Sequence, residues 1–174
     1  MASGHLTKTE ILRLFDLLNA ELAAQGAAGE LHVVGGAVMC LAFGARDATQ
    51  DVDALFQPAR VIREAAARVA ATAGVDQRWI SDAVRAYLSP RGGFDSFLEL
   101  SHLQVFVAHP AYLLAMKCVA LRLGEEFHDL DDVRYLLRHL DIPSADEAMA
   151  IVARYFDEGL LLPKTRLILD SLFE

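Results

Sequence analysis

The chain has 174 residues, of which 54% are hydrophobic, and a formal net charge of −8. This length predicts a single domain, residues 1–174, with a hydrophobic core. The sequence lacks both an apolar run of about 18–20 residues, which a bilayer span needs, and the pattern of a signal peptide. The acidic balance argues against broad, sequence-independent nucleic-acid binding, although a local basic patch could still hold an RNA end or a nucleotide.

Cysteine and histidine usage narrows the class of protein further. Cys40 and Cys118 lie in apolar helical patterns without a C-x-x-C pair. We interpret them as reduced core residues rather than as a disulfide or a zinc site. The six histidines are scattered, which argues against structural zinc. The sequence therefore predicts a cytoplasmic protein that does not engage a membrane.

The first two thirds of the chain alternate between helical and strand patterns. Apolar residues three and four apart predict helices, and short apolar runs bounded by turn residues predict strands. The expected helices are 7–25, 36–43 and 60–73, and the expected strands are 31–34, 51–56, 97–100 and 103–107. Segment 79–88 is ambiguous, and we assign it to a helical turn that leads into a loop at 90–93.

From Pro110 onward every expected element is a helix, and Pro110 itself suits a first helical turn. The expected helices are 111–123, 130–139, 145–155 and 164–172. A small mixed sheet followed by helices predicts an α+β fold. Within it we expect a core over about 30–140 and a helical C-terminal extension over 141–174.

A double glycine, Gly35-Gly36, joins the apolar run 31–34 to the next expected helix. A glycine turn before a helix exposes bare backbone N–H groups, which commonly cradle phosphate. Alternatively, the pair is only a tight strand-to-helix turn that needs a positive φ.

Asp51 and Asp53 flank a single valine within the second expected strand. Residues two apart in a strand project to the same face, where two carboxylates repel each other unless a cation lies between them. Alternatively, both are exposed carboxylates on an edge strand. A phosphate cradle beside a divalent-metal site suggests phosphoryl or nucleotidyl transfer.

The order strand, Gly-Gly, helix and Asp-x-Asp strand resembles the nucleotidyltransferase fold of polymerase β-like and minimal nucleotidyltransferases. Arg46-x-x-Thr49-x-Asp51-Val52-Asp53 resembles the lead-in of the AbiEii-like branch, which includes toxins of toxin–antitoxin pairs. The segment 109–117 resembles that branch's step into a helix with an active-site lysine, here Lys117. The resemblance covers roughly residues 30–140.

The resemblance continues after Lys117, because Arg122 followed by Asp129 and Asp132 is similar to the branch's next motif. It implies that Asp51 and Asp53 hold two Mg²⁺ ions and that Asp51, Asp53, Lys117 and Asp129 are catalytic. Nucleotide binding would fall to the following residues: Gly35, Gly36, Arg46, Thr49 and Lys117. Lys117 and Arg46 would neutralise charge on the pyrophosphate, and Asp129 would orient Lys117 or the acceptor.

The implied reaction moves a nucleoside monophosphate from a nucleoside triphosphate to a protein side chain or a tRNA 3′ end. Many members of the family carry a third carboxylate on a later strand, but segment 103–107 has none. Glu99 is the only acidic candidate in that pair of strands. Without it, the attacking hydroxyl lacks a general base of the usual kind.

Several motif residues have a structural alternative. Arg46 could form a surface salt bridge with Asp47 or Asp51. Lys117 could extend from its apolar helix into water. Asp129 and Asp132 could be first-turn acids that the helix dipole favours. We expect Trp79 to be a packing residue.

Two other function classes follow from the same residues. One is a degenerate, non-catalytic nucleotidyltransferase domain that binds nucleotide or a protein. The other is a helical interaction module whose C-terminal helices dock an antitoxin-type protein or a second copy, since the mean hydropathy of +0.29 is high for a soluble monomer.

Overall fold

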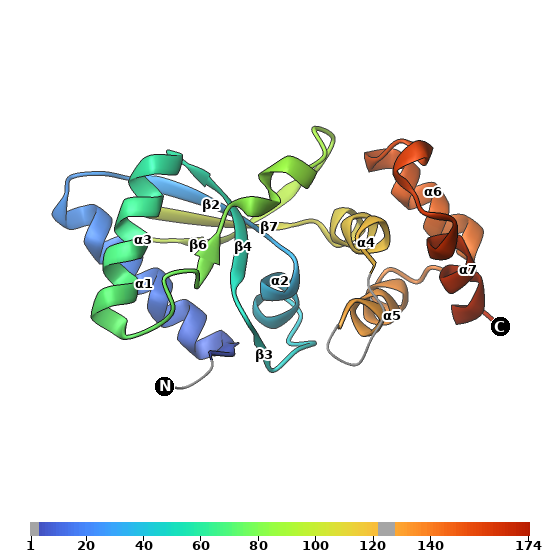
Figure 1. The fold of residues 1–174 in the computed structure, drawn as a ribbon, viewed down its shortest axis with the longest axis horizontal. Coiled ribbons are helices and arrows are strands. Elements are labelled where there is room, and N and C mark those ends of the chain that lie inside the picture. The colour runs from blue at the N-terminus through green and yellow to red at the C-terminus, as the bar shows by residue number, and fades with distance from the viewer. Residues whose placement is uncertain (1–3, 122–127) are drawn as a thin grey trace. The chain divides into compact units, whose positions relative to one another are not determined.

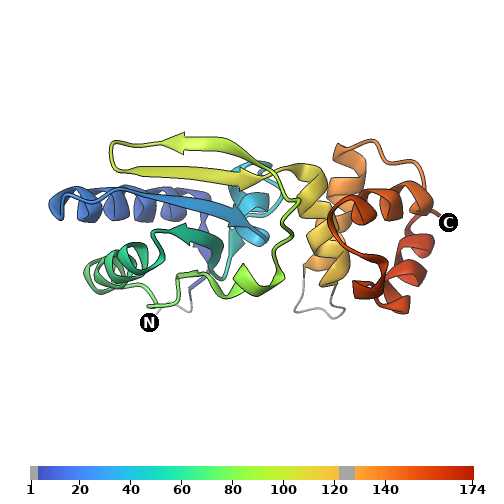
Figure 2. The same cartoon turned by 90° about the horizontal axis from the view of Figure 1, so that it is seen from above.

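The fold is α+β, as the sequence predicts, and the computed structural model describes residues 4–121 and 128–174. The chain divides into two compact units (Figures 1 and 2). The first contains the residues up to Tyr87 together with Phe94–Ala108, and the second contains Leu88–Gly93 and His109–Glu174. The expectation of a single domain stays a prediction. No helix among the described residues is both long and apolar enough to cross a bilayer.

A mixed sheet of five strands forms the centre of the first unit, in the order β5-β4-β2-β7-β6. The strands are β2 (Gly29–Val34), β4 (Val52–Gln57), β5 (Ile80–Ser81), β6 (Phe94–Glu99) and β7 (Leu103–Ala108). β2 runs antiparallel to β4 and parallel to β7, while β6 is antiparallel to β7 and β5 is parallel to β4. The strand pair predicted around 97–107 is confirmed, and its first strand starts three residues earlier than expected.

One face of this sheet is apolar and packs against two helices, α1 (Lys8–Ala24) and α3 (Ala59–Ala73). The buried strand residues share this face by register: Leu31, Val33, Val52, Ala54, Phe56, Leu103, Val105 and Val107. α1 starts at a capping box, in which the Thr7 hydroxyl accepts from the Glu10 N–H and the Glu10 carboxylate accepts from the Thr7 N–H. α3 ends at Gly74, which has φ +70°. Both predicted helices are confirmed.

The opposite face of the sheet differs in chemistry. His32, Leu55 and Phe106 are half-buried there and lie side by side by register. Two residues away on each strand, in the direction of Glu30, the same face carries the polar side chains of Glu30, Gln57 and Gln104. This face therefore combines an apolar row with a polar row.

Three two-residue strands were not expected from the sequence. β1 (Leu6–Thr7) and β3 (Ala48–Thr49) form a two-stranded antiparallel pair. Segment 79–88 forms β5 and a 3₁₀ helix, η1 (Ala83–Tyr87), so the predicted helical turn is present but is preceded by a strand. Two-residue strands leave no periodic signal, because their pairing depends on a distant segment.

Trp79 has the packing role that we expect from the sequence. Its side chain is 1% exposed, and the indole Nε1 donates a hydrogen bond to the Ala66 carbonyl at 3.1 Å. Both cysteines are buried, which confirms their interpretation as core residues. Burial raises the pKa of Cys118 to about 12, so this thiol is unreactive at neutral pH.

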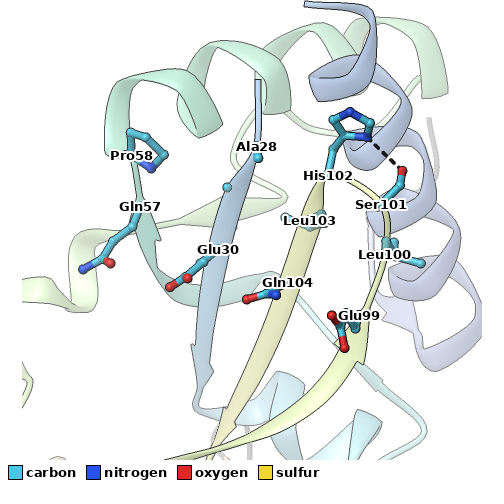
Figure 3. Close-up of a pocket in the computed structure, with 11 residues that line it drawn as sticks. Ala28, Glu30, Gln57, Pro58, Glu99, Leu100, Ser101, His102, Leu103 and Gln104 are labelled. Atoms are coloured by element: carbon cyan, nitrogen blue, oxygen red, sulfur yellow. Dashed lines mark hydrogen bonds between the residues drawn. The ribbon is translucent and has the colours of Figure 1, made fainter. Parts of the chain in front are cut away.

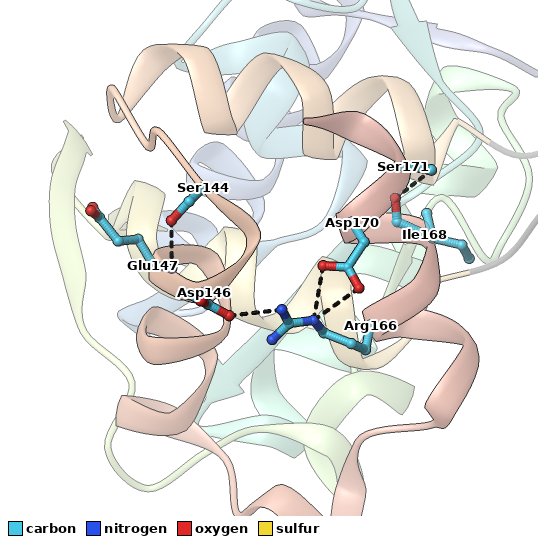
Figure 4. Close-up of polar contacts among 7 residues, drawn as sticks. All are labelled: Ser144, Asp146, Glu147, Arg166, Ile168, Asp170 and Ser171. Atoms are coloured by element: carbon cyan, nitrogen blue, oxygen red, sulfur yellow. Dashed lines mark hydrogen bonds and ion pairs between the residues drawn. The ribbon is translucent and has the colours of Figure 1, made fainter. Parts of the chain in front are cut away.

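The second unit is helical, as predicted. Its elements are α4 (Pro110–Val119), α5 (Asp129–His139), α6 (Ala145–Tyr155), the 3₁₀ helix η2 (Glu158–Leu160) and α7 (Pro163–Leu172). α4 packs against α5 and α6, and α6 packs against α7. Arg166 on α7 pairs with Asp146 of α6 at 2.7 Å and with Asp170 at 3.0 Å (Figure 4). These exposed ion pairs orient α7 rather than supply much stability.

Candidate functional site

The site in the first unit starts at the corner where β2 ends. Gly35 has φ +69° and ψ −151°, a conformation that only glycine adopts readily, and α2 (Gly36–Leu41) begins at the next residue. The positive φ expected of this turn is therefore present. Because α2 has only six residues, its dipole is short, and positive charge at the corner must come from a side chain.

Arg46 supplies that charge beside the backbone of Gly36. A Cβ on residue 36 would lie 3.0 Å from Thr49 Oγ1, 3.2 Å from Arg46 Cζ and closer still to Arg46 Nη1. The absence of a side chain at Gly36 thus makes room for the guanidinium and the hydroxyl. β3 positions Thr49, whose Oγ1 donates a hydrogen bond to the Asp51 carbonyl at 3.3 Å.

Asp53 faces the same corner from the neighbouring strand. In the antiparallel register of β2 and β4, Asp53 lies opposite Val34, the residue before the double glycine. A Cβ on Gly35 would contact Asp53 Oδ2 at 3.3 Å. The first unit therefore brings together five of the residues that the sequence predicts for this site: Gly35, Gly36, Arg46, Thr49 and Asp53.

Asp51 immediately precedes β4 and is half-buried. Burial raises the pKa of its carboxyl, because desolvation disfavours the charged form. Within residues 4–121 and 128–174, no hydrogen bond or ion pair offsets this effect at the carboxylate. A cation beside Asp51 would remove this penalty.

Ser81 was missed by the sequence analysis. It lies on β5 directly beside Asp53, and its Oγ accepts a hydrogen bond from the Ala83 N–H at 3.2 Å. A two-residue strand has no sequence signal that would place Ser81 next to the Asp-x-Asp motif. Ser81 adds a hydroxyl to the carboxylate side of the corner.

Glu99 does not complete a carboxylate triad with Asp51 and Asp53. By register Glu99 lies beside Gln104, and Gln104 lies beside Glu30. Glu30 is four residues before Val34, the partner of Asp53. At about 3.3 Å per residue, Glu99 and Asp53 are separated by roughly 13 Å along the strands, at opposite ends of the sheet. Glu99 therefore does not supply a third carboxylate to this corner.

The described residues hold no group of three or more His, Cys, Asp or Glu side chains that could bind a metal by itself. This does not conflict with magnesium. Mg²⁺ is usually bound through one or two carboxylates, with water and substrate phosphates completing its shell. Asp51 is half-buried, has no hydrogen-bond or ion-pair partner at its carboxylate among the described residues, and lies two residues from Asp53. Such a carboxylate fits a magnesium ion that arrives with a nucleotide.

The second unit contains the other predicted site residues. Lys117 is 9% exposed, so it does not extend into water. Its Nζ lies 3.1 Å from Asp129 Oδ1 and 2.8 Å from Asp132 Oδ2, and these carboxylates are 3% and 2% exposed. Asp129 thus makes the contact that a role in positioning Lys117 requires. Arg122 lies outside the described residues.

This buried cluster of Lys117, Asp129 and Asp132 joins α4 to α5. Both aspartates are in the first turn of α5, as the helix-dipole alternative predicts, but their burial and their contact with Lys117 show that the dipole is not their only interaction. The cluster therefore holds α4 and α5 together within the second unit.

Comparison with family models, with curated proteins and with solved structures returned no match for this chain.

Proposed function

We propose that the chain binds a magnesium–nucleoside triphosphate at the corner after β2 and transfers its nucleotidyl group to an acceptor. The proposal uses residues of the first unit alone. The observation that carries it is the convergence of Arg46 and Thr49 on the bare backbone of Gly36, with Asp53 against Gly35. The nucleotidyltransferase resemblance of the sequence supports the same function.

In this proposal the triphosphate lies against the double glycine. The Arg46 guanidinium is a planar donor that matches phosphate oxygens. The Thr49 hydroxyl, which donates to the Asp51 carbonyl, borders the same space. Gly35 and Gly36 let the phosphates approach the backbone without a side chain between them. These groups bind and orient the triphosphate and stabilise charge on the departing pyrophosphate.

Asp51 and Asp53 would hold the magnesium ion. When bound, the metal would neutralise phosphate charge and polarise the α-phosphorus. The chain supplies hard oxygen ligands there, and the desolvated Asp51 carboxylate favours the approach of a cation. The acceptor remains a protein hydroxyl or a tRNA 3′ end, as the resemblance implies. A cytoplasmic location and a toxin–antitoxin role stay predictions.

A second candidate is nucleotide binding without transfer. The position of Glu99 favours it, because this carboxylate, the candidate that the sequence offers for a general base, lies at the other end of the sheet. A domain of this kind would bind the triphosphate at the same corner and engage a partner protein or a second copy.

One assay separates these candidates. The protein is incubated with each α-labelled nucleoside triphosphate, Mg²⁺, and separate RNA and protein extracts, and label transfer and pyrophosphate are measured. We expect both signals for the wild type and neither for Asp53→Asn. Asp16→Asn, an exposed aspartate on α1, is the matched control and should behave like the wild type. Nucleotide binding without either signal would establish the second candidate, and no binding at all would overturn both.

A further inference from the structure

The sheet face that carries Asp53 also carries a row of two rings and a leucine, two residues away from Asp53 along the strands. On β2, His32 lies opposite Leu55 of β4 and beside Phe106 of β7. Leu55 is two residues from Asp53 on β4, so about 7 Å separates them along the strand. The three side chains form a row on the face away from α1 and α3, and we call them the ring row.

The ring row already contains a stack. The rings of His32 and Phe106 are 4.8 Å apart and nearly parallel, at 10°. Phe94 meets His32 edge-on, with centroids 5.0 Å apart and planes at 85°. Phe106 is only half-buried, and its cross-strand neighbour on β6 is Ser96, a small exposed residue. The Ser96 side chain is therefore too small to cover the Phe106 ring.

His32 shows that this row is not shaped by packing alone. Its Nδ1 is buried without a hydrogen-bond partner among the described residues. Burial lowers the pKa of the imidazole, against a smaller raising effect from Glu30, so the ring is neutral at pH 7. A phenylalanine would fill the same space without an unsatisfied nitrogen.

Beyond the ring row, the polar row of the same face faces a pocket (Figure 3). Gln57, Glu30 and Gln104 lie in register, each two residues from its neighbour in the ring row. They line a pocket of about 570 Å³, a size typical of small-molecule sites. Amides and carboxylates are the groups that read base edges, and a carboxylate accepts from an exocyclic amino group.

Along β4, Asp53, Leu55 and Gln57 thus present a carboxylate, an apolar contact and an amide at successive positions of one face. This order matches the phosphate, the ring and the far edge of a nucleotide. We propose that the ring row is the platform for the base of the bound nucleoside triphosphate and that Glu30 selects a base with an exocyclic amino group. This inference rests on the function proposed above.

The test compares ATP with inorganic tripolyphosphate, each with Mg²⁺, by calorimetry. Tripolyphosphate has the charges without the base, so the proposal predicts tighter binding of ATP. Phe106→Leu should weaken ATP binding about tenfold and leave tripolyphosphate binding unchanged, because stacking on an aromatic ring is lost. Tyr87→Leu, which removes an exposed ring of the same unit, should change neither. Equal effects of both substitutions would overturn the platform.

Two further measurements do not depend on the folding of Phe106→Leu. Saturation-transfer NMR on the wild-type protein should show strong transfer to the adenine protons of ATP, and its absence would overturn the platform. ATP should bind more tightly than ITP, which lacks the amino group, and Glu30→Leu should abolish this difference. Binding of both ATP and tripolyphosphate with equal affinity would reject the platform alone. Binding of neither would reject the proposed function and the platform together.

Discussion

The guanidinium of Arg46 occupies the space that a side chain on Gly36 would fill. A Cβ there would approach Arg46 Nη1 closer than 3.0 Å, a separation that real Cβ contacts do not show. The glycine is therefore needed for the position of the arginine as well as for the turn. This relationship couples the backbone corner to the positive charge of the proposed phosphate site.

Gly36→Ala should consequently displace Arg46 and weaken binding of tripolyphosphate about tenfold or more, since a charge-assisted contact is lost. The unfolding midpoint should change little, because a flexible side-chain end can move aside. Calorimetry and thermal melting measure the two effects. Gly159→Ala is the control, since a Cβ at Gly159 meets nothing within 4 Å. Unchanged binding in Gly36→Ala would show that Arg46 does not contact the phosphates.

Asp51→Asn should stabilise the metal-free protein, because it removes a desolvated charge. We expect a rise in Tm on the order of 2–4 °C at pH 7, with loss of the Mg²⁺-dependent increase in nucleotide affinity. The folded-state pKa of Asp51 is raised, so its charge destabilises the fold at neutral pH and this effect fades as the carboxyl takes up a proton. The advantage of asparagine should therefore vanish as the pH falls toward about 4. A variant less stable than the wild type at pH 7 would contradict this account.

His32 should make the fold sensitive to mild acid. Its folded-state pKa is lowered by burial, so between that value and the unfolded value of about 6.5 the unfolded chain binds the extra proton. Stability should then fall as the pH drops below about 6.5. His32→Phe lacks this response, so the difference in Tm between variant and wild type should grow from pH 7.5 to pH 5.5. A constant difference would mean that the imidazole does not resist protonation.

Lys117→Met should destabilise the protein by about 3–5 kcal/mol, because it leaves the buried carboxylates of Asp129 and Asp132 without their ammonium partner. Denaturant unfolding followed by circular dichroism measures the loss. The triple variant Lys117→Met/Asp129→Asn/Asp132→Asn should recover most of it, since no buried charge remains. A loss below about 1 kcal/mol in the single variant would show that this cluster contributes little. Any activity lost in Lys117→Met needs this comparison before it is called catalytic.

The regular elements follow closely from local pattern. The apolar spacing of residues 11–22 and the Thr7 cap define α1, and α6 spans the predicted residues 145–155. These patterns are strong because one face of each helix is buried against a continuous apolar surface. The 3₁₀ helix η1 and the two-residue strands β3 and β5 are too short to show an apolar period in the sequence. The two strands were therefore missed, and η1 was only partly predicted.

The sequence by itself determined the α+β class, the strand–glycine–helix corner and the presence of two aspartates after it, because these depend on residues close together in the chain. Only the tertiary structure placed Arg46 in the space at Gly36, Ser81 beside Asp53 and His32 on Phe106. The tertiary structure also shows that Glu99 lies at the opposite end of the sheet from Asp53. Alternation along a strand tells which face a side chain occupies, whereas the register between strands tells which end, and register is set by distant partners.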